Sequence, residues 1–328
     1  LSERYNRGRC ALPVATCRFD EQLPRRLYHR RSPSVNGQAQ LVPLAAELAA
    51  FESISLDELN AEAELQTRVD RKYILNAAAL PALIGAMSSE TRVLEVGGSH
   101  ALRYESQYFD TPRLDSYLGA AQSRRRRFKV RTRSYLDSDA SFLEVKTRGG
   151  RSTTVKERVP LAPPAAGIAE LDTAGRRYAE EVLADACIPS AEQIARTLRP
   201  NLATSYRRIT LLLAGDVARG ASRATIDLEL RWHELGGTTL NLPAAAIVET
   251  KSARHAGELD HALWHLGHRP AQLSKYATGL AAMHPALPSN KWHRTLNRFF
   301  HHRDEAAPAA AFRRASLQNG HGLNWSTS

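Results

Sequence analysis

The chain has 328 residues, of which 43% are hydrophobic, and its formal net charge is +11. This length suits one large domain or two smaller ones, and the charge favours a polyanionic partner such as nucleic acid, anionic lipid or a phosphate-rich small molecule. The three cysteines form no CxxC pair, which argues against a disulfide framework or a zinc site. No apolar run approaches the roughly 18 residues of a membrane span, so we expect a cytoplasmic protein.

The first half of the chain begins without regular periodicity and then predicts alternating helices and strands. Residues 1–42 mix Arg, Pro, Ser and Gly and predict a disordered basic extension. Apolar spacing predicts helices at 44–63 and 77–88, and strands at 65–75 and 101–109. The stretch 123–159 predicts three more strands joined by turns.

The second half predicts three further strands between helices. Residues 170–198 are helical by pattern, with a break near Pro189. Strands follow at 205–215, 222–232 and 245–252, and helices at 256–267, 273–283 and 290–303. We expect a folded domain over 43–288, followed by a C-terminal helix and a disordered tail over 289–328.

Charged side chains alternate along the predicted strands, so that each strand has one charged face. The cations of the stretch 123–159 at these positions are Lys129, Arg131, Arg133, Lys146, Arg148, Lys156 and Arg158. Eight strands with turn-sized or helical connections predict an α+β fold, an eight-stranded antiparallel β-barrel with flanking helices over its apolar faces. Two cations about 6 Å apart repel by about 3 kcal/mol at an effective dielectric near 20. The lumen is therefore predicted to be wet and filled by anions.

Carboxylates share these charged faces, which a simple anion trap would not need. They are Glu144, Asp227, Glu229 and Glu249. Carboxylates beside a phosphate site commonly hold Mg²⁺ or Mn²⁺, which prefer oxygen ligands. The alternative is an ordinary sheet with one solvated face and cross-strand ion pairs. That alternative predicts balanced charge, whereas the strands within 123–159 are strongly cationic.

Nine short motifs in order carry a resemblance to a known family. They are RVDRKYIL, SQYFDT, KVRTRSY, FLEVKTR, TVKERV, SYRR, RATIDLEL, IVETK and LSKY. In this order they resemble the VTC (vacuolar transporter chaperone) domain of polyphosphate polymerases, within the triphosphate tunnel metalloenzyme, or CYTH, superfamily. The resemblance spans residues 60–280 and implies a tunnel that binds ATP or polyphosphate with Mn²⁺ or Mg²⁺.

The resemblance also implies roles for individual side chains. The phosphate path would be lined by Lys72, Arg131, Arg133, Lys146, Lys156, Arg208, Arg223 and Lys275, with Lys129, Arg158, Lys251 and Arg68 in support. Glu249 would be the leading metal ligand, supported by Asp227 or Glu229, with Glu144 as a further candidate. The first strand departs from the superfamily pattern Glu-x-Glu-x-Lys, because Arg68 stands in place of the first Glu. This departure fits a more cationic, polymerase-like tunnel.

The activity implied is phosphoryl transfer, with a growing polyphosphate chain attacking the γ-phosphorus of ATP. Two alternatives stay open. One is hydrolysis of triphosphate or nucleoside triphosphate on the same scaffold. The other is a non-catalytic polyanion-binding or nucleic-acid-binding module, which would favour exposed aromatics among the arginines. Aromatic residues make up only 7% of the chain, and we expect no nucleic-acid partner.

Overall fold

A computed structural model describes residues 44–62, 69–148, 154–161, 169–213, 222–235, 237–242, 244–252 and 255–300. The predicted extension over 1–42, the tail beyond 300 and Arg68 lie outside these residues. The strands are β1 (Glu52–Ile54), β2 (Val69–Asn76), β3 (Arg92–Leu94), β4 (Leu102–Asp110), β5 (Arg127–Tyr135), β6 (Ala140–Arg148), β7 (Thr154–Leu161), β8 (Arg199–Leu213), β9 (Ser222–Glu234), β10 (Thr239–Leu242) and β11 (Ala245–Ser252).

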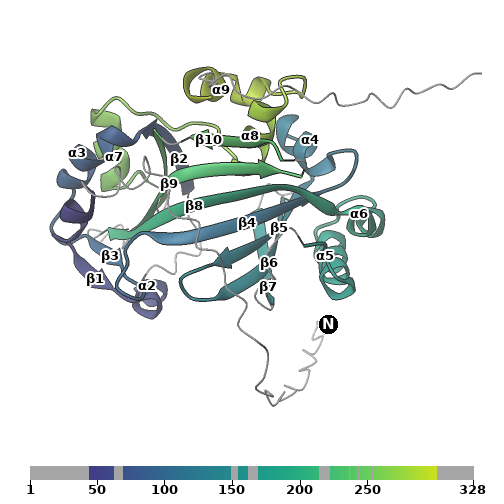
Figure 1. Cartoon of the computed structure of the whole chain (residues 1–328), viewed down its shortest axis with the longest axis horizontal. Coiled ribbons are helices and arrows are strands. Elements are labelled where there is room, and N and C mark those ends of the chain that lie inside the picture. The colour runs from purple at the N-terminus through teal and green to yellow at the C-terminus, as the bar shows by residue number, and fades with distance from the viewer. Residues whose placement is uncertain are drawn as a thin grey trace, which may run out of the picture. The chain divides into compact units, whose positions relative to one another are not determined.

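The strands are joined and flanked by short helices (Figure 1). The helices are α2 (Leu56–Glu62), α3 (Leu80–Gly85), α4 (Asp115–Ala121), α5 (Thr173–Asp185), α6 (Ala191–Thr197), α7 (Glu258–His265), α8 (Lys275–Met283) and α9 (His293–Phe299), with 3₁₀ turns at Ala77–Ala79 and Asn290–Trp292. No helix among the described residues is long and apolar enough to cross a membrane.

The strands form one largely antiparallel sheet, which confirms the predicted α+β class with flanking helices. Its main path runs β2-β11-β9-β8-β4-β5-β6-β7, and these are the eight strands expected from the sequence. The predicted closed barrel is wrong, because β2 and β7 end the path without pairing with each other. Alternation along a strand identifies its two faces but carries no information on whether the first and last strands pair.

The predicted count of eight strands is also wrong, because the sheet has 11. The additional strands β1, β3 and β10 have three or four residues each, too few for alternation to be visible. The expected helix over 44–63 is interrupted by β1, which pairs in parallel with β3. Ile54 on β1 is buried, so tertiary packing overrides the local helical pattern there.

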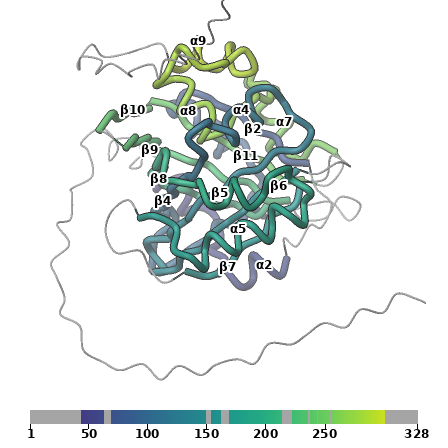
Figure 2. The backbone as a smooth tube through the Cα atoms, turned by 90° about the vertical axis from the view of Figure 1, so that its right-hand side faces the viewer, coloured from purple at the N-terminus to yellow at the C-terminus, as the bar shows by residue number. Residues whose placement is uncertain are grey.

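Helices cover the outer faces of the sheet and close one end of its inner face. Residues of α3 and α7 join one buried cluster with the outer face of β2, β8, β9 and β11. Residues of α5 and α6 form a second cluster with β5 and β6, and Figure 2 shows α5 beside β6. The helices α4 and α8 pack together in a third cluster that includes Trp232 and Tyr276. The charged faces are thereby left on the inside of the curved sheet.

A β-bulge in β9 breaks the predicted alternation of that strand. The register with β8 shifts between Ser205 and Arg207, and Glu229 adopts the left-handed conformation with φ of 53°. Before the bulge Asp227 faces inward, whereas Glu229 contacts Arg207 on the opposite face. The expectation that Asp227 and Glu229 share one face is therefore wrong, because a single extra residue reverses the side-chain order.

Candidate functional site

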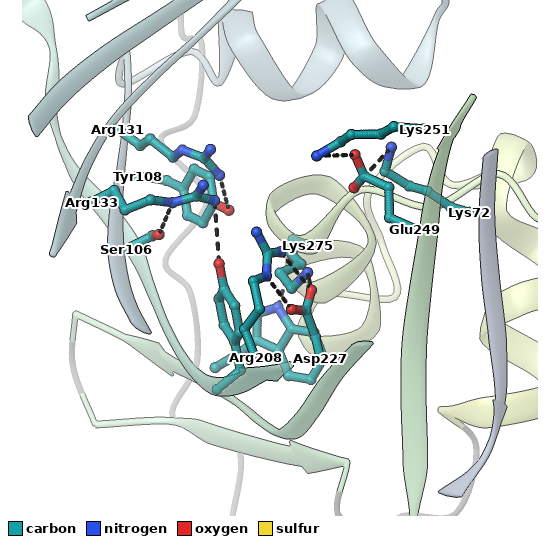
Figure 3. Close-up of polar contacts among 12 residues, drawn as sticks. Lys72, Ser106, Tyr108, Arg131, Arg133, Arg208, Asp227, Glu249, Lys251 and Lys275 are labelled. Atoms are coloured by element: carbon teal, nitrogen blue, oxygen red, sulfur yellow. Dashed lines mark hydrogen bonds and ion pairs between the residues drawn. The ribbon is translucent and has the colours of Figure 1, made fainter. Parts of the chain in front are cut away.

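The inner face of the sheet encloses a polar pocket with a cavity volume of about 250 Å³. Charged side chains from β2, β5, β6, β7, β8 and β11 converge on it, together with the first turn of α8. Arg131 and Arg133 lie across the pocket from Lys72, Glu249 and Lys251 (Figure 3). The lining residues are Asp70, Lys72, Tyr108, Lys129, Arg131, Arg133, Glu144, Lys146, Lys156, Arg208, Glu249, Lys251, Leu273, Ser274 and Lys275.

The deepest ion pair joins Arg208 on β8 to Asp227 on β9. Arg208 Nε donates to Asp227 Oδ1 at 2.6 Å and Nη2 donates to Oδ2 at 2.9 Å. Lys275, at the start of α8, also donates to Asp227 (Figure 3). Asp227 is fully buried. Burial acts to raise its pKa, but Arg208 and Lys275 outweigh this effect and lower the pKa to about 2. Asp227 is therefore an ionised counterion at any physiological pH.

Glu144 on β6 is likewise the counterion of two other cations. Arg131 lies directly opposite on β5, and its Nε donates to Glu144 Oε2 at 2.7 Å. Lys156 Nζ on β7 lies 2.6 Å from the other oxygen, Oε1. The Glu144 side chain is only 2% exposed. Burial acts to raise its pKa, but Arg131, Arg133 and Lys156 lower it to about 2. Both of its oxygens are thus engaged by cations.

Glu249 on β11 is the most accessible of the three carboxylates. Lys72 Nζ lies 3.4 Å from its Oε2, and Lys251 Nζ lies 3.4 Å from its Oε1, so neither contact is a short hydrogen bond. Its side chain is 16% exposed, compared with 2% for Glu144 and 0% for Asp227. Lys251 and Lys72 overcome the effect of burial and hold the Glu249 pKa well below its usual value.

Three cations of the pocket have no carboxylate partner within the described part of the chain. Lys129 donates to Ser274 Oγ at 3.0 Å, and Arg133 donates to Tyr206 Oη at 3.2 Å. Lys146 lies directly opposite Lys129 on one side and Lys156 on the other. Like charges directly opposite each other destabilise a sheet. This row of lysines is therefore a strong indication of an anion-binding site.

Tyrosine rings form the wall behind these cations. Tyr206 stacks on Tyr104 with ring centroids 5.5 Å apart, and the Arg208 guanidinium lies 5.3 Å from the centre of the Tyr206 ring. Burial acts to raise the pKa of Tyr206, but Arg133, Arg208 and Lys275 lower it overall. The aromatic faces favour cations held in this orientation, so the guanidinium groups are fixed before any phosphate binds.

Helix α8 begins inside the pocket. Its N-cap Ser274 accepts a hydrogen bond from the backbone N–H of Ala277 at 3.3 Å, and Ser274 and Lys275 both line the cavity. The N-terminus of a helix carries a partial positive charge and favours anions. The helix therefore adds to the cationic field and closes the pocket on this side.

The structure brings most of the sequence-predicted site residues together, and three of those it describes lie elsewhere. Arg223 is outside the pocket lining, although it lies directly opposite the lining residue Lys251. Arg158 is exposed, and its guanidinium lies 4.7 Å from the centre of the Phe142 ring. Glu229 points to the outer face beyond the bulge, and Arg68 lies outside the described residues. The bulge removes Glu229 from any metal site formed with Asp227.

Several lining residues were not among the sequence-predicted site residues. Asp70 alternates with Lys72 on β2, so its position was visible in the pattern, although only the cation was predicted. Ser274 precedes Lys275 in the LSKY motif. Tyr206, which is outside the lining but contacts Arg133, belongs to SYRR. Tyr108 donates no charge, and its contact with Arg131 (3.3 Å from Nη1 to Oη) depends on the register between β4 and β5.

The described residues offer no preformed metal cage. They contain no group of three or more His, Cys, Asp or Glu side chains placed to hold a metal ion, and both oxygens of Glu144 and of Asp227 face cations. Magnesium commonly binds through one or two carboxylates together with substrate phosphates. The donor set thus fits a divalent ion that arrives on phosphate oxygens and takes Glu249 as its protein ligand.

The solved structures that are similar to this chain include the following three. An adenylyl cyclase-like protein from Hippeastrum, described as having a dominant triphosphatase activity, is 12% identical with a TM-score of 0.35, covering 66% of this chain and 96% of its own. A Pyrococcus horikoshii protein is 14% identical with a TM-score of 0.35, covering 65% and 98%. A conserved hypothetical protein from Pyrococcus furiosus is 11% identical with a TM-score of 0.33, covering 64% and 99%.

None of the curated proteins compared with the chain matches it. The VTC domain family model matches residues 67–284, which is more than half of the 328 residues. This match begins at the strand that carries Lys72 and ends after α8, so it contains every side chain that lines the pocket. It confirms the resemblance drawn from the nine motifs, and the chain belongs to the VTC domain family.

Proposed function

We propose that this protein is an ATP-dependent polyphosphate polymerase, in which the γ-phosphoryl group of ATP is transferred to the end of a polyphosphate chain inside the pocket. The observation that supports this proposal is the balance of charge. Nine cationic side chains line the cavity, and four carboxylates face them, including the buried Asp227. The excess of positive charge suits a triphosphate group, which carries about four negative charges at neutral pH.

The reaction would be an in-line displacement at phosphorus. A terminal oxygen of the polyphosphate chain forms a bond to the γ-phosphorus, and the bond from that phosphorus to the β,γ-bridging oxygen breaks, so that ADP leaves with the electron pair. Arg131, Arg133 and Arg208 would hold the equatorial oxygens and offset their charge. A divalent ion on the phosphates, with Glu249 as its protein ligand, would supply further charge neutralisation.

The ionisation of the carboxylates favours phosphate over water as the nucleophile. A phosphate oxygen is already anionic and needs no base, whereas water must lose a proton. Glu144 and Asp227, with pKa values of about 2, are poor proton acceptors near neutral pH. Glu249 also has a lowered pKa. None of these three carboxylates is therefore suited to activate water.

A second candidate function, triphosphate hydrolysis, is favoured by the lysines. Burial and the neighbouring Arg131, Lys146, Lys72 and Lys275 lower the pKa of Lys129 well below its usual value. A neutral amine at this position could accept a proton from water. The two functions thus make opposite predictions for replacing Lys129 by arginine, which keeps the charge but cannot act as a base.

The deciding experiment incubates the protein with ATP and Mn²⁺ and separates the products on a gel. Chains longer than triphosphate support the polymerase, and free phosphate without chains contradicts it. Lys129→Arg should retain chain synthesis if phosphate is the nucleophile, and should lose phosphate release if Lys129 activates water. Glu249→Gln should weaken the dependence on Mn²⁺ in either case. Arg177→Gln, which removes an exposed cation on α5, serves as the matched control.

A further inference from the structure

A second group of cations lies beyond the row of lysines, outside the residues that line the pocket. Arg127 on β5 and Arg148 on β6 are directly opposite each other. Each is two residues along its strand from Lys129 or Lys146, and residues two apart point to the same face at a distance of about 7 Å. The inner face therefore carries two consecutive rows of like charge.

Lys291, from the C-terminal part of the chain, completes this group. Its Nζ donates to the carbonyl of Ala120 at the end of α4, at 3.0 Å. Arg127 Nη1 donates to the carbonyl of Arg124 at 2.6 Å. Gly119, the neighbour of Ala120, packs against Arg127, since a Cβ at position 119 would lie 3.2 Å from Arg127 Cβ. The three cations therefore lie near one another, and burial and the charges of Arg127 and Arg148 lower the pKa of Lys291. We call Arg127, Arg148 and Lys291 the outer cation group.

The outer cation group has no carboxylate partner among the described residues. The Arg148 side chain makes no hydrogen bond or ion pair with the described residues, so its guanidinium has all its donors available. The three side chains are each partly exposed. Capping of α4 explains the contact of Lys291 with the carbonyl of Ala120, and Arg127 binds a carbonyl in the turn after α4, but neither contact explains Arg148. An arrangement that repels itself and includes an uncommitted guanidinium is suited to bind an anion.

We propose that the outer cation group is a second phosphate-binding site, which holds the part of a linear polyphosphate chain that extends past Lys129 and Lys146 out of the pocket. The proposal rests on the proposed function and makes it more specific: the substrate is a chain longer than triphosphate, and it leaves the pocket toward the end of α4. No exposed aromatic ring lies within the group, since Trp292 is buried. Single-stranded nucleic acid, which needs rings for base stacking, is therefore the poorer fit.

The test compares the binding of inorganic triphosphate and of long-chain polyphosphate by calorimetry, in the wild-type chain and in Arg148→Gln/Lys291→Gln. We expect the affinity for triphosphate to be unchanged and the affinity for long-chain polyphosphate to fall about tenfold, with a shallower salt dependence because fewer counterions are released. A variant with Arg148→Lys in place of Arg148→Gln should regain most of the lost affinity for long-chain polyphosphate, because lysine keeps the positive charge at position 148. Arg177→Gln is again the control, since it removes an exposed cation far along the sequence from the group.

Each other outcome contradicts a defined part of the proposal. An equal loss of affinity for triphosphate and for long-chain polyphosphate would show that the substitutions alter the pocket itself. Unchanged binding of both would show that it binds no phosphate. Loss of single-stranded RNA binding, with polyphosphate binding retained, would assign the group to nucleic acid. If the wild-type chain bound neither triphosphate nor polyphosphate, the proposed function itself would fail. If wild type bound triphosphate as tightly as the long chain, only the outer site would fail. Thermal unfolding of each variant excludes misfolding as the cause.

Discussion

Arg208 and Asp227 lie directly opposite each other on β8 and β9 and are joined by two hydrogen bonds of 2.6 and 2.9 Å. The same relation recurs for Arg131 and Glu144, and for Lys72 and Glu249, each pair across two neighbouring strands. The inner face is thus built from three cross-strand pairs, each with a second cation on the same carboxylate. The carboxylates keep the cations charged and oriented, and the cations without a carboxylate are left for the phosphates.

Replacing Asp227 by Asn should destabilise the protein strongly. The substitution leaves the buried cations Arg208 and Lys275 without their counterion. Removing one partner of a buried ion pair lowers the unfolding free energy by about 3–5 kcal/mol. Urea unfolding measures the loss. Glu181→Gln, which breaks an exposed pair with Arg177 on α5, should cost less than about 1 kcal/mol. A loss as small as that of the control would show that the buried pair contributes little.

Acid should remove the stabilisation that Asp227 provides. Its pKa is about 2 in the folded protein and 3.8 in the reference state, so its contribution is complete above pH 3.8 and is lost as the pH falls towards 2. The shift corresponds to about 2 kcal/mol. The difference in unfolding free energy between wild type and Asp227→Asn should therefore shrink over this range. A difference that stays constant from pH 5 to pH 2, measured by urea unfolding, would contradict the lowered pKa.

The alternation in the sequence predicted which side chains face the pocket better than it predicted whether the sheet closes. The eight main strands and most of the pocket cations followed from alternation, because a period of two places every second side chain on one face. Closure depends on the pairing of β2 with β7, which are far apart in the chain, and alternation within a strand does not determine it. The prediction that Glu229 shares the inner face with Asp227 was wrong for a different reason. One residue with positive φ reverses the face of everything after it, and no residue type marked the bulge, since Glu rarely adopts this conformation.

The pairing within the site could not be predicted either. Sequence reasoning assigned Glu144 and Asp227 to a metal because carboxylates near phosphates often hold one. The register shows instead that each carboxylate faces an arginine on the next strand and is approached by a lysine from elsewhere. Lys275 reaches Asp227 from a helix that follows β9 by more than forty residues. Such a contact depends on how α8 enters the sheet, which local patterns do not specify.

Replacing Lys129 by Met should stabilise the fold and weaken phosphate binding. Lys129 has no carboxylate partner among the described residues, and burial together with Arg131 and Lys146 disfavours its charged form. An apolar side chain at this position therefore removes both the cost of burying the amine and any repulsion. We expect a gain of about 1 kcal/mol in unfolding free energy and a loss of about tenfold in triphosphate affinity. Glu144→Gln is the opposite case and should lower the stability, because it removes a counterion. A Lys129→Met variant that is less stable than wild type would show that its hydrogen bond to Ser274 outweighs the repulsion.

Binding of triphosphate should take up protons at mildly alkaline pH, and Lys251 should be one source of this effect. Burial lowers its pKa to about 8, with Arg208 and Arg223 acting in the same direction and Glu249 and Asp70 opposing them. The amine is therefore neutral in much of the free protein above pH 8, and a bound phosphate favours its charged form again. Affinity should fall by up to about tenfold per pH unit above 8 through this group.

Calorimetry at pH 8.5 in two buffers of different ionisation enthalpy measures the uptake. Lys251→Arg should take up fewer protons than wild type, because a guanidinium stays charged throughout this range, while its affinity at pH 7 should change little. Because triphosphate itself titrates, the comparison is made between the two proteins under the same conditions. The same uptake in both would mean that Lys251 stays charged in the free protein, and that the attraction of Glu249 and Asp70 outweighs burial.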